Sequence, residues 1–179
     1  LKPHPLFEDE GLALLKTHYY GGIKKYQWLS VPLALHGVVA KENGDAIRVV
    51  IGENPGDPVF TVSDLLPHLA KDQMEKKMAE AVPGESLNVL VAGLPLGGPE
   101  LKERFKLAVL EHLNRWYGLV EEDFISAELE LVPAWPARDI GLDRSFVGGY
   151  GQDDRVCAYA SLRAVLEVTG PERTAVLVL

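Results

Sequence analysis

The chain has 179 residues, of which 47% are hydrophobic and 25% are charged, and its formal net charge at pH 7 is -8. This composition is typical of a globular protein with one large domain or two small ones. The acidic balance and the lack of a Lys/Arg cluster argue against a nucleic-acid partner. No apolar run approaches the roughly 20 residues that span a bilayer, so no membrane partner is expected.

Cysteine usage indicates the compartment. The only cysteine is Cys157, which excludes a disulfide within the chain and favours a reducing compartment. We therefore expect a cytoplasmic protein. The first residue is Leu1 rather than Met, which suggests a piece of a longer protein.

The N-terminal residues carry connector and turn signals. Residues 1–15 contain Pro3 and Pro5 close to their start and are predicted to form an extended connector. The pair Gly21-Gly22 indicates a turn with a close backbone approach or a positive φ. His18, just before this turn, has no partner at metal-ligand spacing, so a hydrogen-bonding or surface role is expected for it.

Three β-strands are predicted next. Residues 28–40 and 46–51 are rich in apolar and β-branched side chains, and the Asn-Gly pair at 43–44 is a strong signal for a two-residue hairpin turn. Pro32 places part of the first run at a sheet edge or a bulge. Residues 59–62 follow as a short third strand.

Two amphipathic helices are predicted to pack on these strands. The first begins at Ser63-Asp64 and continues to about residue 82. Its apolar row recurs every four residues at Leu66, Ala70, Met74, Met78 and Val82. The second helix begins at Pro99 and stops at Gly118. His112 lies on the apolar face of this helix and is interpreted as a core histidine.

The remaining strands lie on either side of the second helix and at the C-terminal end. Residues 87–92 form an apolar run, and residues 125–131 alternate between apolar and polar side chains, so one face of that strand is buried. Residues 135–145 are predicted to be a linker. A last helix ends at Gly170, and the aliphatic run 174–179 is typical of an interior parallel strand.

The most informative local feature is the stretch Gly148–Asp154, where a glycine-rich turn leads to two adjacent carboxylates at a helix start. Two aspartates would repel a phosphate, so the usual anion-binding role of such turns is disfavoured. A cation site and an ordinary helix cap remain as alternatives. On a helical wheel Asp154 points towards the interior and Asp153 lies nearer the edge. Because a buried carboxylate needs a partner, Asp154 is the candidate metal ligand and Asp153 the candidate cap or supporting group.

These elements predict an α/β fold with an inserted α+β module. Residues 1–22 and 148–179 have the features of an α/β domain, in which a buried helix precedes a parallel strand. Residues 23–147 form the insert, a strand-rich module with two amphipathic helices. One helix–strand unit cannot make a parallel sheet, so either the chain is a fragment of a larger protein or another molecule completes the sheet. We take the first of these interpretations.

Several stretches, taken together, resemble a known family. They are Leu1–Pro3, Tyr20–Ile23, Leu66–Leu69 and Gly149–Leu162, and they occur in the family's order along nearly the whole chain. The most specific of them is Gly151–Arg155. On these motifs the chain resembles the aspartyl aminopeptidase and vacuolar aminopeptidase I family of dinuclear zinc exopeptidases. In that family a dimerisation domain, which corresponds to residues 23–147, interrupts the catalytic domain.

The resemblance implies a metallo-aminopeptidase that removes N-terminal residues from peptides. Asp154 matches the carboxylate that bridges two zinc ions, with cobalt or manganese as alternatives, and such a metal pair activates a shared water. His68 matches a residue that reaches into the partner subunit's active site and hydrogen-bonds the oxyanion. The resemblance also implies a homodimer that assembles further into a dodecamer. No residue indicates whether acidic or neutral N-terminal residues are preferred.

The other site residues of the family do not occur in this sequence. In the family a His-x-Asp motif precedes the position of Leu1, and a Glu-Glu pair that includes the general base follows the position of Leu179. The chain alone is therefore expected to be inactive. A second hypothesis is a non-catalytic dimerisation module, in which strand 125–131 and the edge at Pro32 pair across a subunit boundary. A third is that the two aspartates only cap a helix.

Overall fold

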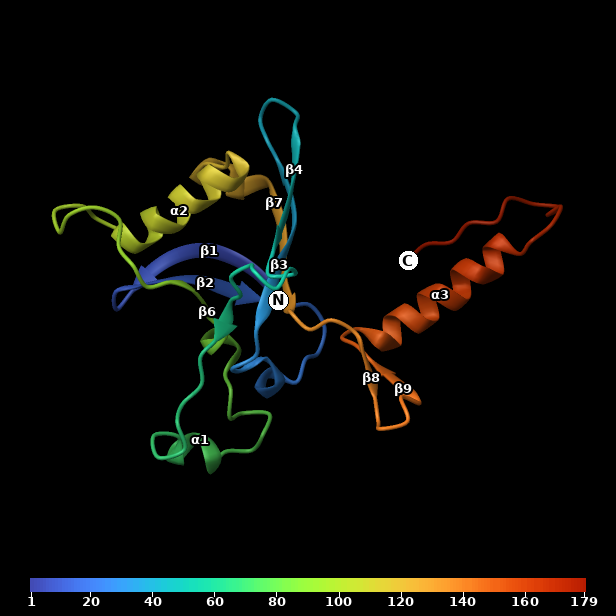
Figure 1. Cartoon of the computed structure of the whole chain (residues 1–179), viewed down its shortest axis with the longest axis horizontal. Helices are drawn as coiled ribbons and strands as arrows, with labels where there is room; N and C mark the ends of the chain where they lie inside the picture. The colour runs from blue at the N-terminus through green and yellow to red at the C-terminus, as the bar shows by residue number, and fades with distance from the viewer. The chain divides into compact units, whose positions relative to one another are not determined.

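The computed structural model describes all 179 residues and consists of two compact units, Leu1–Ala134 and Trp135–Leu179 (Figure 1). The first unit contains two β-sheets and one long helix, and the second contains a β-hairpin and another long helix. The prediction that the chain combines helices and β-sheets is confirmed. The boundary between the two compact units falls at Trp135, whereas the predicted domain boundaries lie at about residues 22 and 147. Those boundaries concern domain membership in the complete protein, and they stay a prediction.

The chain opens with a β-hairpin, so the predicted connector over residues 1–15 is wrong. Strands β1 (Lys2–Asp9) and β2 (Leu12–His18) pair antiparallel across a two-residue turn. Glu10 and Gly11 in that turn have φ angles of 48° and 74°, as in the tight turns that match the twist of β-strands. Prolines are tolerated in β1 because the pairing register shifts just after Pro3.

Two antiparallel sheets form the first unit. The four-stranded sheet has the order β1-β2-β6-β5, with β5 at Thr61–Val62 and β6 at Val89–Ala92. The three-stranded sheet has the order β4-β3-β7, with β3 at Leu33–Ala40, β4 at Ala46–Ile51 and β7 at Ala127–Pro133. Both sheets contain neighbours that are distant in the sequence.

Local patterns in the three-stranded sheet are largely confirmed. The predicted β3–β4 hairpin forms, although its connection Lys41–Asp45 is longer than the expected two residues. In β7, Leu129 and Leu131 are buried and Glu130 between them is exposed, as predicted. Ile125, which was expected on the buried face, precedes the strand and is 86% exposed, so the alternation is wrong at that end. Pro32 directly precedes β3, the central strand, so the predicted edge or bulge at this proline is wrong. A proline ahead of the strand removes no ladder hydrogen bond.

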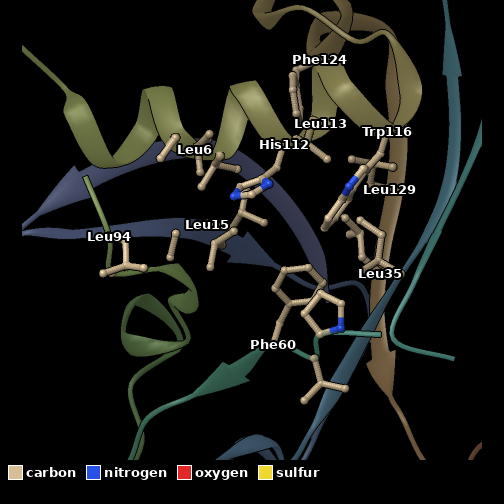
Figure 2. Close-up of a pocket in the computed structure, with 18 residues that line it drawn as sticks. Leu6, Leu15, Leu35, Phe60, Leu94, His112, Leu113, Trp116, Phe124 and Leu129 are labelled. Atoms are coloured by element: carbon tan, nitrogen blue, oxygen red, sulfur yellow. The ribbon is translucent and has the colours of Figure 1, made fainter. Parts of the chain in front are cut away.

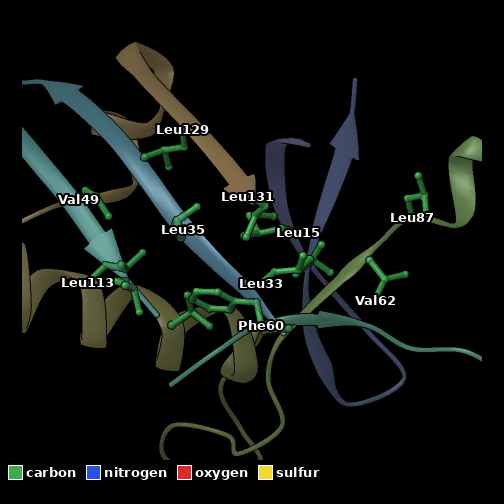
Figure 3. Packing of buried hydrophobic residues seen from close by; sticks show 14 of the residues in the cluster. Leu15, Leu33, Leu35, Val49, Phe60, Val62, Leu87, Leu113, Leu129 and Leu131 are labelled. Atoms are coloured by element: carbon green, nitrogen blue, oxygen red, sulfur yellow. The ribbon is translucent and has the colours of Figure 1, made fainter. Parts of the chain in front are cut away.

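The two sheets share one hydrophobic core (Figure 3). Its largest fully buried side chains are Leu33, Val39, Val49, Val62, Leu87, Val89 and Leu131. Leu33 and Phe60 exchange backbone hydrogen bonds of 2.8 and 2.9 Å, which join β3 to the residue just before β5. The core is therefore continuous across the two sheets, and burial of its apolar side chains is the main stabilising term of this unit.

Helix α2 (Arg104–Tyr117) packs on β1, β2 and β6 and covers one side of this core. Its start is later than the predicted Pro99. Its end is confirmed, because Gly118 adopts a φ of 66° and its N–H donates to the backbone oxygen of Asn114 at 2.7 Å.

The N-terminus of α2 is capped by a residue from another element. Glu103, at the N-cap position, makes no side-chain cap. Glu8 of β1 takes this role, because its Oε2 accepts hydrogen bonds from the backbone N–H groups of Phe105 at 2.8 Å and Lys106 at 3.4 Å. A carboxylate at this end satisfies free N–H groups and interacts favourably with the helix dipole. The contact ties β1 to α2.

We expect Glu8→Ala to lower the free energy of unfolding by about 1 kcal/mol, the usual cost of losing a helix cap. Asp9→Ala is the control, because Asp9 is exposed and adjacent but makes no bond to the helix. Urea unfolding of the complete protein, followed by circular dichroism, compares the two variants with the wild type. Equal losses of stability in both variants would contradict the cap.

The segment between β5 and β6 does not form the predicted amphipathic helix. Its only α-helix is the four-residue α1 (Lys71–Met74). Ala70 is buried, but Met74 and Met78 are 71% and 65% exposed, so the apolar row has no continuous surface to pack against. Pro67 breaks the start of the pattern, and most helical stability in proteins comes from packing of an apolar face. The four-residue spacing of apolar side chains is therefore not sufficient to form a helix over residues 66–82.

The second unit contains a hairpin where the sequence predicts a linker. Strands β8 (Arg138–Ile140) and β9 (Phe146–Gly148) pair antiparallel and are followed by helix α3 (Gln152–Leu166). Helix α3 confirms the helix predicted after Gly151. The parallel strand predicted for residues 174–179 is absent, because those residues have no strand beside them to pair with.

Short 3-10 helices complete the secondary structure. They lie at Lys25–Trp28, Gly84–Ser86 and Glu121–Ser126. None of the helices has the length and apolar character needed to cross a bilayer.

Candidate functional site

The start of α3 presents two adjacent carboxylates. Gly151 occupies the N-cap position with a φ of 69°, and its backbone oxygen accepts from the N–H of Arg155 at 3.1 Å. Asp153 Oδ1 accepts from the backbone N–H of Asp154 at 3.0 Å. The side chain of Asp154 makes no hydrogen bond and is exposed. Asp153 therefore serves the backbone of the first turn, while the Asp154 carboxylate is free to bind another group.

Helix α3 is not buried within its unit. None of its residues is buried, and Val156, Tyr159 and Leu166 are 58%, 65% and 68% exposed. The prediction that this helix is covered on most of its circumference, with Asp154 facing the interior, is therefore wrong for this chain. A helix that is apolar on most sides needs structure around it, and the hairpin of its own unit does not supply it.

The metal-binding capacity of the chain is limited. No group of three or more His, Cys, Asp or Glu side chains is arranged to hold a metal ion. A zinc site in a peptidase requires several protein ligands together with an open position for water or substrate. Asp154 can supply one carboxylate, but the residues of this chain do not form a zinc site by themselves.

His68 lies on a turn that projects an exposed side chain. The turn is closed by backbone hydrogen bonds from Leu69 to Leu66 (2.8 Å) and from Ala70 to Pro67 (3.3 Å). Ala70 is 5% exposed and anchors the end of the turn in the first unit. The His68 side chain is exposed and makes no hydrogen bond. Both of its ring nitrogens are therefore available to another molecule. His68 and Asp154 belong to different units.

An apolar pocket of about 360 Å³ lies beside α2 (Figure 2). Its walls come from both sheets and from α2, and include Leu15, Leu35, Phe60, Leu94, Leu113 and Trp116. His112 also lines it and is exposed, so its interpretation as a core histidine is wrong. It is the only titratable side chain in the lining. The pocket therefore lacks the paired acid, base or nucleophile that hydrolysis requires. The sequence predicted the apolar face of α2 but gave no signal for the pocket between α2 and the sheets.

Several of the shifted pKa values arise from structural contacts in the first unit. Lys2 Nζ lies 2.6 Å from Glu130 Oε1, and this hydrogen bond lowers the pKa of Glu130 and raises the pKa of Lys2. Asp57 accepts hydrogen bonds from Asn54 and Gly52, and the bond from the Asn54 backbone contributes most to the lowered pKa of its carboxyl group. These groups hold β1 to β7 and fix the loop after β4. They form no cleft with catalytic groups.

The chain as a whole matches a class of metal-dependent peptidases. Residues 1–177 match the sequence profile described as aminopeptidase I zinc metalloprotease (M18). The chain therefore belongs to the M18 family of zinc metalloproteases, and the family that its motifs resemble is confirmed.

Relatives at high identity support this membership. A probable M18 family aminopeptidase 1 from Clostridium acetobutylicum is 54% identical over 179 residues, which are 100% of this chain and 38% of that protein. The crystal structure of an M18 aminopeptidase from Thermotoga maritima matches with a TM-score of 0.84 at 55% identity, over 94% of this chain and 37% of that chain. Aminopeptidase I from Borrelia burgdorferi matches with a TM-score of 0.75 at 40% identity, over 92% and 36%. The chain thus spans about 38% of the length of these relatives.

Proposed function

We propose that the complete protein is a zinc aminopeptidase that removes N-terminal residues from peptides. The family match over residues 1–177 is the observation that carries this proposal. The chain alone lacks a metal site, so we expect it to be inactive in isolation. The single cysteine remains the reason to expect a reducing compartment such as the cytoplasm.

Within this enzyme we assign the metal ligand to Asp154 and a supporting role to Asp153. The support is the free, exposed carboxylate of Asp154 at the start of α3, beside a carboxylate that is already bonded to the helix backbone. A bound pair of zinc ions would polarise the peptide carbonyl and activate water, with cobalt or manganese as substitutes. Asp154 would hold the two ions together from one side. The exposed apolar residues of α3 would pack against parts of the catalytic domain outside this chain.

His68 is assigned to the active site of a partner subunit in a homodimer, which would assemble further into a dodecamer. The support is its exposed position on an anchored turn without any hydrogen bond of its own. An imidazole N–H at the developing oxyanion would stabilise the transition state more than the ground state. Residues 23–147 would then form the dimerisation domain of the complete protein.

A second candidate function is an assembly module without chemistry. The pairing edge first expected at Pro32 does not exist, but the segment around His68 exposes Leu65, Leu66 and Leu69 at 55%, 60% and 64%. Large apolar side chains grouped on the surface favour a protein–protein contact. This candidate is compatible with the first, since the same contact could bring His68 to its partner.

Metal removal tests the proposed function. Complete protein treated with a chelator and then dialysed should lose hydrolysis of N-terminal residues, and added zinc, cobalt or manganese should restore it. The control is the same protein carried through the procedure with zinc present. Hydrolysis that survives complete metal removal would contradict the proposal. Self-association without hydrolysis under any metal would favour the assembly module.

A further inference from the structure

The geometry points to Asp64 and Gln73 as positioning residues that hold the His68 turn in the conformation needed by the partner's active site. This inference rests on the proposed function of His68 and adds two residues to it. The side chains of Asp64 and Gln73 close the two ends of the loop that carries His68. We call this pair the loop latch.

The latch is defined by two hydrogen bonds to one oxygen. Asp64 Oδ1 accepts from the backbone N–H of Leu65 at 2.8 Å and from Gln73 Nε2 at 3.2 Å. The second bond spans nine positions of the sequence, with His68 near the middle of the span. The first bond fixes the direction in which the chain leaves Asp64. Both bonds therefore act on the path of the loop and not on His68 itself.

Besides the two backbone hydrogen bonds of the His68 turn and the buried side chain of Ala70, the loop has few restraints. Ala70 is buried, but Leu65, Leu66 and Leu69 are more than half exposed. The helix that follows has only four residues, Lys71–Met74, and contains no buried residue. The His68 side chain has no hydrogen bond that would orient it. Its direction is therefore set by the backbone of the turn, and the latch is the side-chain contact that ties the ends of this loop together.

Positioning of this kind affects the chemical step more than substrate binding. A group that stabilises the transition state loses most of its effect when it is misplaced by about 1 Å. A loosened loop would keep the imidazole chemically intact but reduce the fraction of time it spends at the oxyanion. We therefore expect kcat to fall while KM and the zinc content stay the same.

Steady-state kinetics of the complete zinc-loaded protein test the latch. Asp64→Ala should lower kcat about 10-fold. Asp64→Asn should stay within about twofold of the wild type, because its amide oxygen can accept the same two bonds. Gln73→Met removes only the bond across the loop, and should also lower kcat even if Asp64→Ala folds poorly. Asp72→Ala is the matched control, because this exposed carboxylate lies on the same segment but makes no hydrogen bond.

A double-mutant cycle with His68→Phe separates positioning from general stability. If the latch acts through His68, Asp64→Ala should cause no further loss of kcat when His68 is already absent. Multiplied losses in the double variant would overturn the inference, and so would a wild-type kcat in both Asp64→Ala and Gln73→Met. If His68→Phe alone leaves kcat unchanged, the proposed role of His68 fails, and the latch fails with it. The His68→Phe variant by itself therefore distinguishes a failure of the proposed His68 role from a failure of the latch alone.

Discussion

Replacing Asp154 by alanine in the complete protein should lower the rate of peptide hydrolysis by about 1,000-fold or more. Asp154 would be one of the residues that hold the proposed pair of metal ions, and the pair would supply polarisation of the peptide carbonyl and activation of water. Loss of this carboxylate should also reduce the zinc content from about two ions per subunit towards one. Activity against N-terminal residues of peptides and zinc content after dialysis are the two measurements.

Asp153→Ala is the matched control for this prediction. It removes the same charge from the neighbouring position, but the Asp153 carboxylate is bonded to the backbone N–H of Asp154 in the first turn of α3. We therefore expect a small loss of stability and a much smaller loss of activity. Equal activity of Asp154→Ala and the wild type would reject Asp154 as a ligand and return both aspartates to the role of helix caps. Equal and large losses of activity in the two variants would contradict the assignment of Asp154 as the ligand and Asp153 as a supporting residue.

Replacing His68 by phenylalanine should lower kcat about 100-fold without changing the zinc content. The expected size is that of losing one hydrogen-bond donor to an oxyanion. The fold should tolerate the substitution, because the His68 side chain is exposed and makes no hydrogen bond within the chain. His112→Phe is the control, since His112 is also exposed but lines an apolar pocket that accepts an aromatic ring. A large loss of stability with full turnover per folded subunit would indicate a structural role for His68 instead.

Mixing two inactive variants tests whether His68 acts across a subunit boundary. In a mixed dimer of Asp154→Ala and His68→Phe subunits, one site would combine an intact Asp154 with an intact His68 from the partner. With random exchange of subunits, half of the dimers are mixed and one of their two sites is complete, so about one quarter of the wild-type activity should return. If His68 acts in its own subunit, no mixed dimer has a complete site. Activity that does not return after demonstrated subunit exchange would therefore contradict the assignment.

Local signals in the sequence predicted much of the fold. The Asn-Gly pair indicated the β3–β4 hairpin, the alternation of β7 indicated its buried and exposed faces, and Gly118 marked the end of α2. Each of these features depends only on residues that are close together in the sequence. The turn at Glu10–Gly11 has a positive φ at both residues, but the prolines of β1 favoured an extended connector over a hairpin in the sequence.

The sequence predicted poorly the structure of segments that need to pack against a surface distant in the sequence. The apolar row of residues 66–82 indicated a helix, but no apolar surface of the first unit lies along the whole row, and Met74 and Met78 remain exposed. Asp154 was expected to face an interior that the second unit does not provide. In both cases the pattern shows what a segment could bury, and the tertiary structure decides whether a partner surface is there.

The sequence by itself identified the family, which the match over residues 1–177 confirms. It also predicted His68 and Asp154 as site residues, because the motifs around them are short and contiguous, and their roles stay a proposal. Only the tertiary structure decided which strands are neighbours, that Glu8 caps α2, and that Asp64 and Gln73 close the loop around His68. The Glu8 and Asp64 contacts join residues 97 and 9 positions apart, and Leu33 of β3 pairs with Pro133 of β7. Their formation depends on how the chain closes around its core, which spacing along the sequence does not reveal.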